Sequence, residues 1–261
     1  MSAKLLDLDK HQPIRGGSSP ASHIIAVGGG KGGIGKSFVS TNIAIFLANM
    51  GFNTIIVDLD LGAANTHTAL GESLTKVGLS DFVNGRASSL ESVATPTQIN
   101  NLRLISGCND EVDMANLDVT KRSYLMSSLY SLPADYIILD LSAGTHQSTI
   151  DFFLMAQTKL VVFTPEPSSI ENGYRFMKAS FFRKIKRFEM QMGLKASIDS
   201  IMNPNSRFNI KTPAELITAL KEVDEVKGLG LETIMSNLDF KIVLNQTRTY
   251  KDIEIGRSVQ S

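Results

Sequence analysis

Short apolar runs recur along the chain, and most of them are continuous and rich in β-branched residues. They occupy Ile24–Val27, Thr54–Asp58, Leu102–Ser106, Tyr136–Asp140, Leu160–Thr164 and Lys241–Asn245. A strand that is apolar along its whole length is typical of a parallel sheet with helices on both faces. The pattern therefore predicts a mostly parallel sheet built from these runs.

Apolar residues at helical spacing lie between the runs. One predicted helix carries a single apolar face made of Val39, Ile43, Phe46, Leu47 and Met50, and Gly51 would end it. A second helix is expected to begin near Ser168, which forms a capping-box pattern with Glu171. The alternation of strand and helix predicts an open, doubly wound α/β fold, which binds ligands at the carboxyl ends of its strands.

The domain organisation follows from where this alternation begins and where it is interrupted. Residues 1–22 are expected to be a flexible tail, with a docking peptide at Leu5, Leu6 and Leu8 as the alternative. Residues 23–261 are expected to form one domain. Within it, residues 190–240 should form a helical insertion before the sixth strand, because Thr212, Pro213 and Glu215 match the N-cap, N1 and N3 positions of a helix.

Composition narrows the range of partners. The chain has 26 basic and 26 acidic residues, so no overall positive field favours DNA or an anionic membrane. DNA binding is thereby disfavoured, although it stays open. The basic run Arg183–Arg187 is expected to be a solvated helix face, with a site for a partner, DNA or lipid as the alternative. Cys108 is the only cysteine, which excludes a disulfide within the chain.

The stretch GGGKGGIGKS at Gly28–Ser37 carries the clearest chemistry. From Gly30 it satisfies the pattern G-x-x-x-x-G-K-[ST], between a predicted strand and a predicted helix. Backbone N–H groups of such a loop and the helix N-terminus bind phosphate oxygens. The residues expected to contact a nucleotide here are Gly30, Lys31, Gly32, Gly33, Ile34, Gly35, Lys36, Ser37 and Phe38.

The individual roles at this loop follow from charge and position. Lys36 should lie along the β- and γ-phosphates, and Ser37 should give its hydroxyl to Mg²⁺. Asp140 ends an apolar run and is the candidate for the Mg²⁺-linked aspartate, with Gly144 placed to offer a backbone N–H to the γ-phosphate. Asp58 and Asp60, in VDLDLG, lie at the same predicted sheet edge. Strand-end aspartates can also simply cap turns, and that alternative stays open.

Several segments together resemble the MinD/ParA family of ATPases with a deviant phosphate loop. They are KGGIGKS, VDLDLGAANTHTALG, LDLSAG, TPEPSSIENGYRF and VLNQTR, and the resemblance covers His23–Arg187 and Lys241–Arg248. Within the family, the chain looks most similar to flagellar-number regulators of the FlhG/FleN type.

The resemblance implies further roles for residues of this chain. It implies ATP or ADP with Mg²⁺ as ligands, and a signature Lys31 that reaches the phosphates of the other subunit in an ATP-dependent homodimer. It implies that Asp60 positions the attacking water and that Asp140 holds Mg²⁺ through water. It also implies that Asn245 hydrogen-bonds adenine and that Arg248 flanks the base. The implied metal site consists of Ser37, Asp60 and Asp140.

The function expected from all this is a regulatory ATPase that converts ATP and water slowly to ADP and phosphate. Its ATP-dependent dimer would act through an unidentified protein partner on the placement or number of a flagellum, division site or cargo. A ParA-like DNA-partitioning ATPase and a biosynthetic enzyme of the dethiobiotin-synthase type are the alternatives. A metal-cluster carrier is disfavoured, since it needs paired cysteines.

The expected location is the cytoplasm. Members of the family continue past the adenine-contacting loop with a helix and another strand, whereas this sequence ends at Ser261. A peripheral position on the inner membrane would require a C-terminal targeting segment in the complete protein. Residues 250–261 show no amphipathic stripe, so membrane association is not supported here.

Overall fold

A computed structural model describes residues 22–60, 65–107, 117–189, 193–203, 205–210, 212–236 and 238–260, with side chains up to residue 256. The expected tail, apart from Ser22, and Cys108 lie outside these ranges. None of the helices within them is long and apolar enough to cross a membrane.

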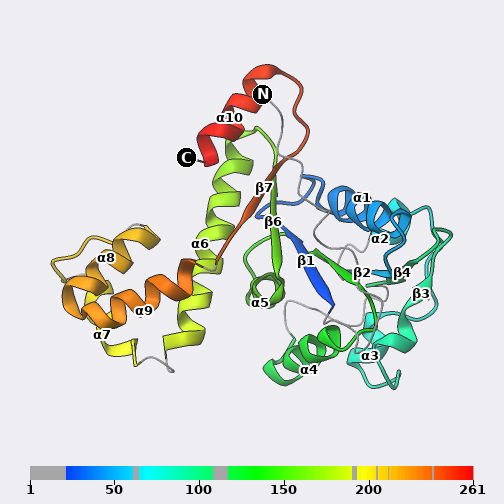
Figure 1. Ribbon diagram of the computed structural model, residues 1–261, viewed down its shortest axis with the longest axis horizontal. Coiled ribbons are helices and arrows are strands. Elements are labelled where there is room, and N and C mark those ends of the chain that lie inside the picture. Colours follow the sequence, from blue (N-terminus) through cyan, green and yellow to red (C-terminus); the bar gives the residue numbers. More distant parts are fainter. Residues whose placement is uncertain are drawn as a thin grey trace.

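The centre of the molecule is a seven-stranded sheet in the order β3-β4-β2-β5-β1-β6-β7 (Figure 1). The strands are β1 His23–Gly28, β2 Thr54–Leu59, β3 Thr95–Pro96, β4 Leu102–Ile105, β5 Tyr136–Leu141, β6 Thr158–Phe163 and β7 Lys241–Leu244. All neighbours pair in parallel except β3 and β4, which are antiparallel. The predicted mostly parallel sheet is confirmed, and β3 is the strand that the apolar runs did not indicate.

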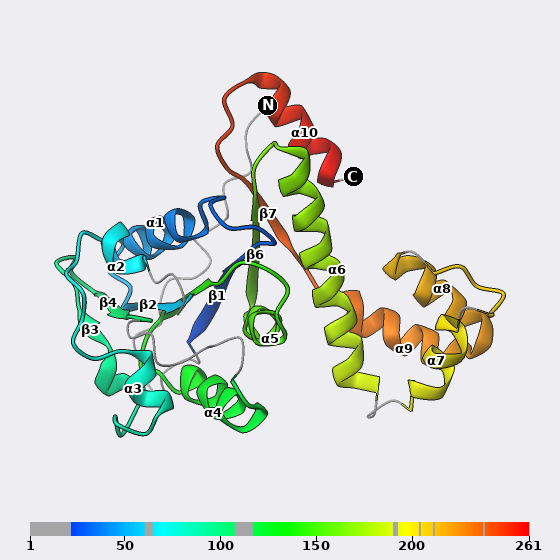
Figure 2. The same ribbon diagram turned by 180° about the vertical axis from the view of Figure 1, so that it is seen from behind.

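Helices cover both faces of this sheet (Figures 1 and 2). One face packs against α1, and the other against α3, α4, α5 and α6, so two separate apolar cores lie on either side. The bounds are α1 Lys36–Asn49, α2 Thr66–Ala69, α3 Leu79–Val83, α4 Val119–Tyr130, α5 Gln147–Met155, α6 Pro167–Glu189, and a 3₁₀ turn at Glu91–Val93. The doubly wound α/β prediction is therefore confirmed.

The face that α1 buries differs from the predicted apolar face. Ser40, Thr41 and Ala44 are buried with Leu47, whereas Phe46 is 54% exposed. Met50, which follows the helix, is 48% exposed. Small side chains on the buried face let α1 approach the sheet closely. The close packing gained in this way outweighs the burial of the larger side chains, which stay at the edge of the contact. The predicted face is thus wrong for Phe46 and Met50. Helix α6 begins at Pro167, so Ser168 lies inside it rather than at its N-cap.

Between α6 and β7 the chain forms α7 Lys195–Met202, α8 Pro213–Val223 and α9 Glu225–Ser236. These helices stand to one side of the sheet, at the far end of α6 (Figures 1 and 2). They share an apolar core with Phe181 and Ile185 of α6. The predicted capping box of α8 is present, with Thr212 and Glu215 bonding each other's backbone N–H. The helical insertion is therefore confirmed.

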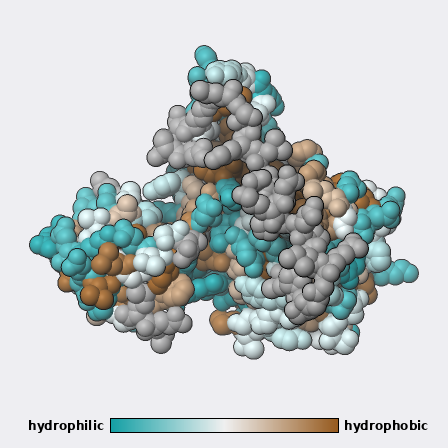
Figure 3. All heavy atoms as spheres, viewed as in Figure 1, coloured by the Kyte–Doolittle hydropathy of each residue, from teal (hydrophilic) through white to brown (hydrophobic). Residues whose placement is uncertain are grey.

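The face of this insertion seen in Figure 3 carries apolar residues among polar ones. Among the described residues of the insertion, the large exposed apolar side chains are Met202, Val223, Val226 and Leu229. After β7, the last described helix, α10 Tyr250–Gln260, lies near the N-terminal end of α6 (Figures 1 and 2).

Candidate nucleotide site

The predicted phosphate loop connects β1 to α1 at the carboxyl edge of the sheet. Two glycines show why the loop needs this residue type. A Cβ on Gly30 would collide with the backbone carbonyl of Asn172 in α6. Gly35 has φ 90°, and a Cβ there would collide with the side-chain amide of Asn245. The loop is therefore enclosed by α6 on one side and by the segment after β7 on the other.

Lys36, at the start of α1, is buried beneath this loop with 7% of its surface exposed. Its Nζ donates a hydrogen bond to the carbonyl of Lys31 at 3.4 Å, across the loop. Burial lowers the pKa of the Lys36 ammonium, while the charges of Asp140 and Asp60 oppose that shift. A desolvated cation held across a loop of backbone N–H groups suits an anionic ligand such as a polyphosphate.

Two aspartates end adjacent strands beside Lys36. Asp58 of β2 and Asp140 of β5 are register partners, and each is 1% exposed. Thr66 connects them: its hydroxyl donates to Asp140 Oδ2 at 3.0 Å, and its backbone N–H donates to Asp58 Oδ2 at 3.1 Å. Burial and the negative charge of Asp140 raise the pKa of Asp58 to about 7. Burial also raises the pKa of Asp140, against hydroxyl groups of Ser37 and Thr66 and the charge of Lys36.

One oxygen of Asp140 is suited to a metal. Its Oδ1 is buried and has no hydrogen-bond partner within the described part of the chain. A buried carboxylate oxygen left in this state is costly, and a hard cation with oxygen ligands relieves the cost. Mg²⁺ beside Asp140 and the Ser37 hydroxyl therefore fits the residues present.

Asp60 and Gly144 lie at the same edge, from the segments after β2 and β5. Asp60 is half-buried, and its backbone N–H donates to Asp58 Oδ1 at 3.0 Å. Gly144 has φ 93°, and its N–H donates to the carbonyl of Gly29 at 3.2 Å. The predicted contact of Gly144 with a γ-phosphate would replace this bond, and it stays a prediction. Residues 61–64, in the first switch motif, lie outside the described residues.

Lys31 has surroundings unlike those of Lys36. Its side chain is 43% exposed, and its Nζ lies 3.5 Å from Glu166 Oε2 and 3.2 Å from Ser168 Oγ. Glu166 immediately precedes α6 and Ser168 lies in its first turn. The second lysine of the loop is thus held at the surface by the start of α6, and its predicted role across a dimer stays a prediction.

The segment after β7 meets the loop from the other side. Asn245 Nδ2 donates to the carbonyl of Ile34 at 2.9 Å, and Gln246 Nε2 donates to that of Gly33 at 3.4 Å. The predicted contact of Asn245 with adenine remains a prediction. So does the role of Arg248, which is exposed and whose backbone N–H donates to Asp252 Oδ2 at 2.8 Å.

Sequence reasoning missed four residues of this site. They are Thr66, Glu166, Ser168 and Gln246. Gln246 directly follows Asn245 and lies inside the quoted VLNQTR segment, so adjacency was the available signal. Thr66, Glu166 and Ser168 also lie inside quoted segments, VDLDLGAANTHTALG and TPEPSSIENGYRF, but their contacts with the site arise because α2 and the start of α6 reach it in three dimensions.

A glycine-rich loop that joins a parallel strand to a helix over a buried lysine, with strand-end aspartates beside it, defines a P-loop nucleotide-binding domain. Comparison with known families agrees. The ParA family model, described as "NUBPL iron-transfer P-loop NTPase", matches residues 20–190. The chain belongs to the ParA/MinD family of P-loop NTPases.

Two curated relatives show the level of similarity. The antiactivator FleN of Pseudomonas aeruginosa is 32% identical over 164 residues, which cover 62% of this chain and 58% of that protein. The septum site-determining protein MinD of Helicobacter pylori is 31% identical over 153 residues, covering 58% and 56%. The matches thus span less than two thirds of either relative.

Solved structures confirm the fold. MinD from Pyrococcus horikoshii OT3, complexed with Mg-ADP, has a TM-score of 0.51 and 21% identity, covering 92% of this chain and 96% of that one. Cobyrinic acid a,c-diamide synthase from Mycobacterium smegmatis, with a bound ATP analogue and magnesium, has a TM-score of 0.54 and 17% identity, covering 78% and 82%. A septum site-determining protein and a diamide synthase share this architecture, so the fold alone does not choose between such functions.

Proposed function

We propose that this chain is a regulatory ATPase of the MinD/ParA type. It binds Mg²⁺-ATP at the Gly30–Ser37 loop, dimerises on ATP, hydrolyses it slowly and acts in the cytoplasm through a protein partner on the placement or number of a cell structure. The observation that carries the proposal is Lys31. Lys36 already supplies the buried cation of the loop, and Lys31 is a second, half-exposed cation beside it.

The residues at the loop divide the work of nucleotide binding. Backbone N–H groups of Gly32–Ser37 and the N-terminus of α1 bind the phosphates, and Lys36 neutralises their charge. The Ser37 hydroxyl and Asp140, whose Oδ1 lacks a partner among the described residues, hold Mg²⁺. Mg²⁺ supplies electrostatic stabilisation to the phosphate oxygens when bound.

Hydrolysis and dimerisation depend on two further residues. Asp60 orients the attacking water. The hydrogen bond from its backbone N–H to Asp58 holds the Asp60 backbone in place. Lys31 leaves Glu166 and Ser168 and extends toward the phosphates of a second subunit, where a late-arriving cation offsets transition-state charge as an arginine finger does. Iron transfer is not part of this proposal, because one cysteine per chain cannot supply paired cysteines.

The test is the mass in solution by light scattering, for wild type and for Asp60→Ala, without nucleotide, with ADP, and with ATP and Mg²⁺. We expect Asp60→Ala to be monomeric without nucleotide and with ADP, and to accumulate as a dimer with ATP. A monomer under all conditions would contradict the proposal and favour a biosynthetic P-loop enzyme, to be followed with a screen of small carboxylate substrates.

A further inference from the structure

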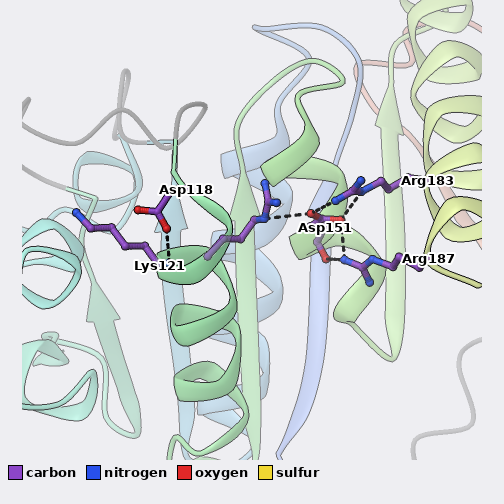
Figure 4. Close-up of polar contacts among 6 residues, drawn as sticks. Asp118, Lys121, Asp151, Arg183 and Arg187 are labelled. Carbon is purple, nitrogen blue, oxygen red and sulfur yellow. Dashed lines mark hydrogen bonds and ion pairs between the residues drawn. The ribbon is translucent and has the colours of Figure 1, made fainter. Parts of the chain in front are cut away.

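A buried aspartate outside the nucleotide site is held by three arginines (Figure 4). Asp151 of α5 has a side chain that is 3% exposed. Arg183 donates from Nε to Oδ1 and from Nη2 to Oδ2, both at 2.7 Å. Arg187 donates from Nη2 to Oδ1 at 2.6 Å, and Arg122 Nε lies 3.1 Å from Oδ2. The expectation of a solvated basic face is therefore wrong for Arg183 and Arg187, which point at Asp151.

This cluster joins three helices at one carboxylate. Arg122 comes from α4, Asp151 from α5, and Arg183 and Arg187 from α6. Burial alone would raise the pKa of Asp151, but the hydrogen bond from Arg183 and the charge and hydrogen bond of Arg187 hold it below its usual value. Apolar side chains of similar volume would pack these helices without the cost of desolvating charges. The directed bonds of Arg183 and Arg187 hold the Asp151 carboxylate of α5 against α6.

Helix α5 contacts the segment that follows β5. The hydroxyls of Ser142 and Thr149 lie 2.8 Å apart, which ties this segment to the first turns of α5. Asp151 lies further along the same short helix. Gly144, from the same segment, contacts Gly29 of the phosphate loop. A shift of α5 would therefore move the backbone expected to meet the γ-phosphate.

Helix α6 extends from the phosphate loop to the helical insertion. Its N-terminal part packs Asn172 against Gly30 and holds Lys31 at Ser168. Further along, Phe181 and Ile185 are buried in the core of α7–α9, while Arg183 from the same stretch reaches Asp151. The helix has 23 residues, a length of about 34 Å. The arginine cluster thus fixes α6 at the same stretch that packs against the insertion, at the opposite end of the helix from the phosphate loop.

We propose that Asp151 is a positioning residue for ATP hydrolysis, which fixes α5 against α6 through Arg183 and Arg187 and so holds Ser142–Gly144 where it senses the γ-phosphate. The inference rests on the proposed ATPase function. It separates two properties: binding of ADP uses the phosphate loop itself, whereas discrimination of ATP from ADP and turnover use the segment that α5 positions.

The test compares Asp151→Asn and Arg183→Gln with the control Arg175→Gln. Arg175 lies on the same helix and pairs with Glu171 at 2.6 Å, but its side chain is 65% exposed. We expect kcat for ATP to fall about tenfold in both cluster variants, as small misplacements of reacting groups do. We expect the affinity for a non-hydrolysable ATP analogue relative to ADP to fall as well, with the Kd for Mg-ADP within about twofold of wild type. Arg183→Lys should recover only part of kcat, because it lacks the two-bond geometry.

The outcomes distinguish the two proposals. A fall in melting temperature with unchanged kcat and unchanged ATP-analogue preference would overturn the positioning role and leave a structural ion cluster. If Asp151→Asn does not fold, Arg183→Gln tests the positioning role instead. In that variant the buried Asp151 carboxylate still pairs with Arg122 and Arg187. If the wild type shows no turnover, the ATPase proposal fails and with it the role of Asp151 in hydrolysis, while the ratio of ATP-analogue to ADP affinity still tests whether Asp151 positions Ser142–Gly144.

Discussion

At the scale of single residues, the two lysines of one loop are set apart by their surroundings. Lys36 is desolvated and bonded across the loop, while Lys31 is half-exposed and rests on Glu166 and Ser168. A phosphate ligand bound by one chain needs only Lys36. Lys31 is exposed enough to contact a ligand held by another molecule.

Lys31→Ala is expected to separate binding from assembly. The Kd for ADP should stay within about twofold of wild type, because Lys31 is not part of the buried cradle, whereas ATP-dependent dimerisation should be lost. Titration calorimetry and light scattering measure the two properties. Lys36→Ala is the matched control and should abolish binding of both nucleotides. An equal loss of ADP and ATP affinity in Lys31→Ala would show that the lysine acts within its own chain.

The aspartate pair gives a dependence of stability on pH. With its pKa raised to about 7, Asp58 keeps a proton in the folded protein that the unfolded chain releases near pH 4. Its contribution to the free energy of unfolding is therefore greatest below pH 4 and falls as the pH rises to about 7, by up to about 4 kcal/mol. Urea unfolding of the nucleotide-free protein between pH 5 and 8 should show this decline.

Asp140→Asn should lessen that decline, because burial, the larger cause of the raised pKa of Asp58, remains while the negative charge of Asp140 is removed. The variant should be more stable than wild type at pH 8 by about 1–2 kcal/mol, and it should lose the Mg²⁺-dependent part of nucleotide affinity. Asp239→Asn, at a carboxylate that is 75% exposed, is the control and should leave the slope unchanged. An Asp140→Asn slope equal to that of wild type would refute the coupling.

At the scale of helices and strands, the sequence predicted what depends on local burial. Strands buried on both faces are apolar almost throughout, which is why the runs that form the inner strands were found. The run of β7 was found from its apolar residues alone, because this edge strand is only partly buried. β3 has two residues and includes Pro96, which leaves no such signal. The loop motif was found because its glycines and lysine are adjacent in sequence. Thr66, Glu166 and the Asp151 cluster were not, because their partners are set by how helices pack. Arg183 reaches a carboxylate 32 residues away.

The close approach of α6 to the phosphate loop gives a test at this scale. Gly30→Ala places a methyl group against the carbonyl of Asn172, so it should destabilise the fold by about 1–3 kcal/mol and weaken nucleotide binding. Gly32→Ala is the matched control, because a Cβ there meets nothing within 4 Å. Urea denaturation should separate the two variants. Equal stabilities of Gly30→Ala and Gly32→Ala would mean that α6 can shift away from the loop at Asn172 without cost.

At the scale of the whole molecule, helices α7–α9 have their own core and are attached through α6. Leu220→Ala, at a fully buried position in that core, should cost about 2–4 kcal/mol locally. Hydrogen exchange should then accelerate in α7–α9 and remain slow in β1 and β5, with Mg-ADP affinity unchanged. Exchange that accelerates equally in the central sheet would show that the insertion and the sheet unfold as one unit.

The ion pair between Lys31 and Glu166 affects the protein concentration at which the proposed dimer would form. An exposed ion pair such as that with Glu166 is worth no more than about 1 kcal/mol, or about fivefold in an equilibrium constant. A symmetric dimer breaks two of them, which raises the concentration for half-maximal dimerisation by up to about 25-fold. In the ATP-dependent dimer that we propose, Glu166 would therefore set a threshold of abundance, below which ATP-loaded chains would stay monomeric and above which they would pair.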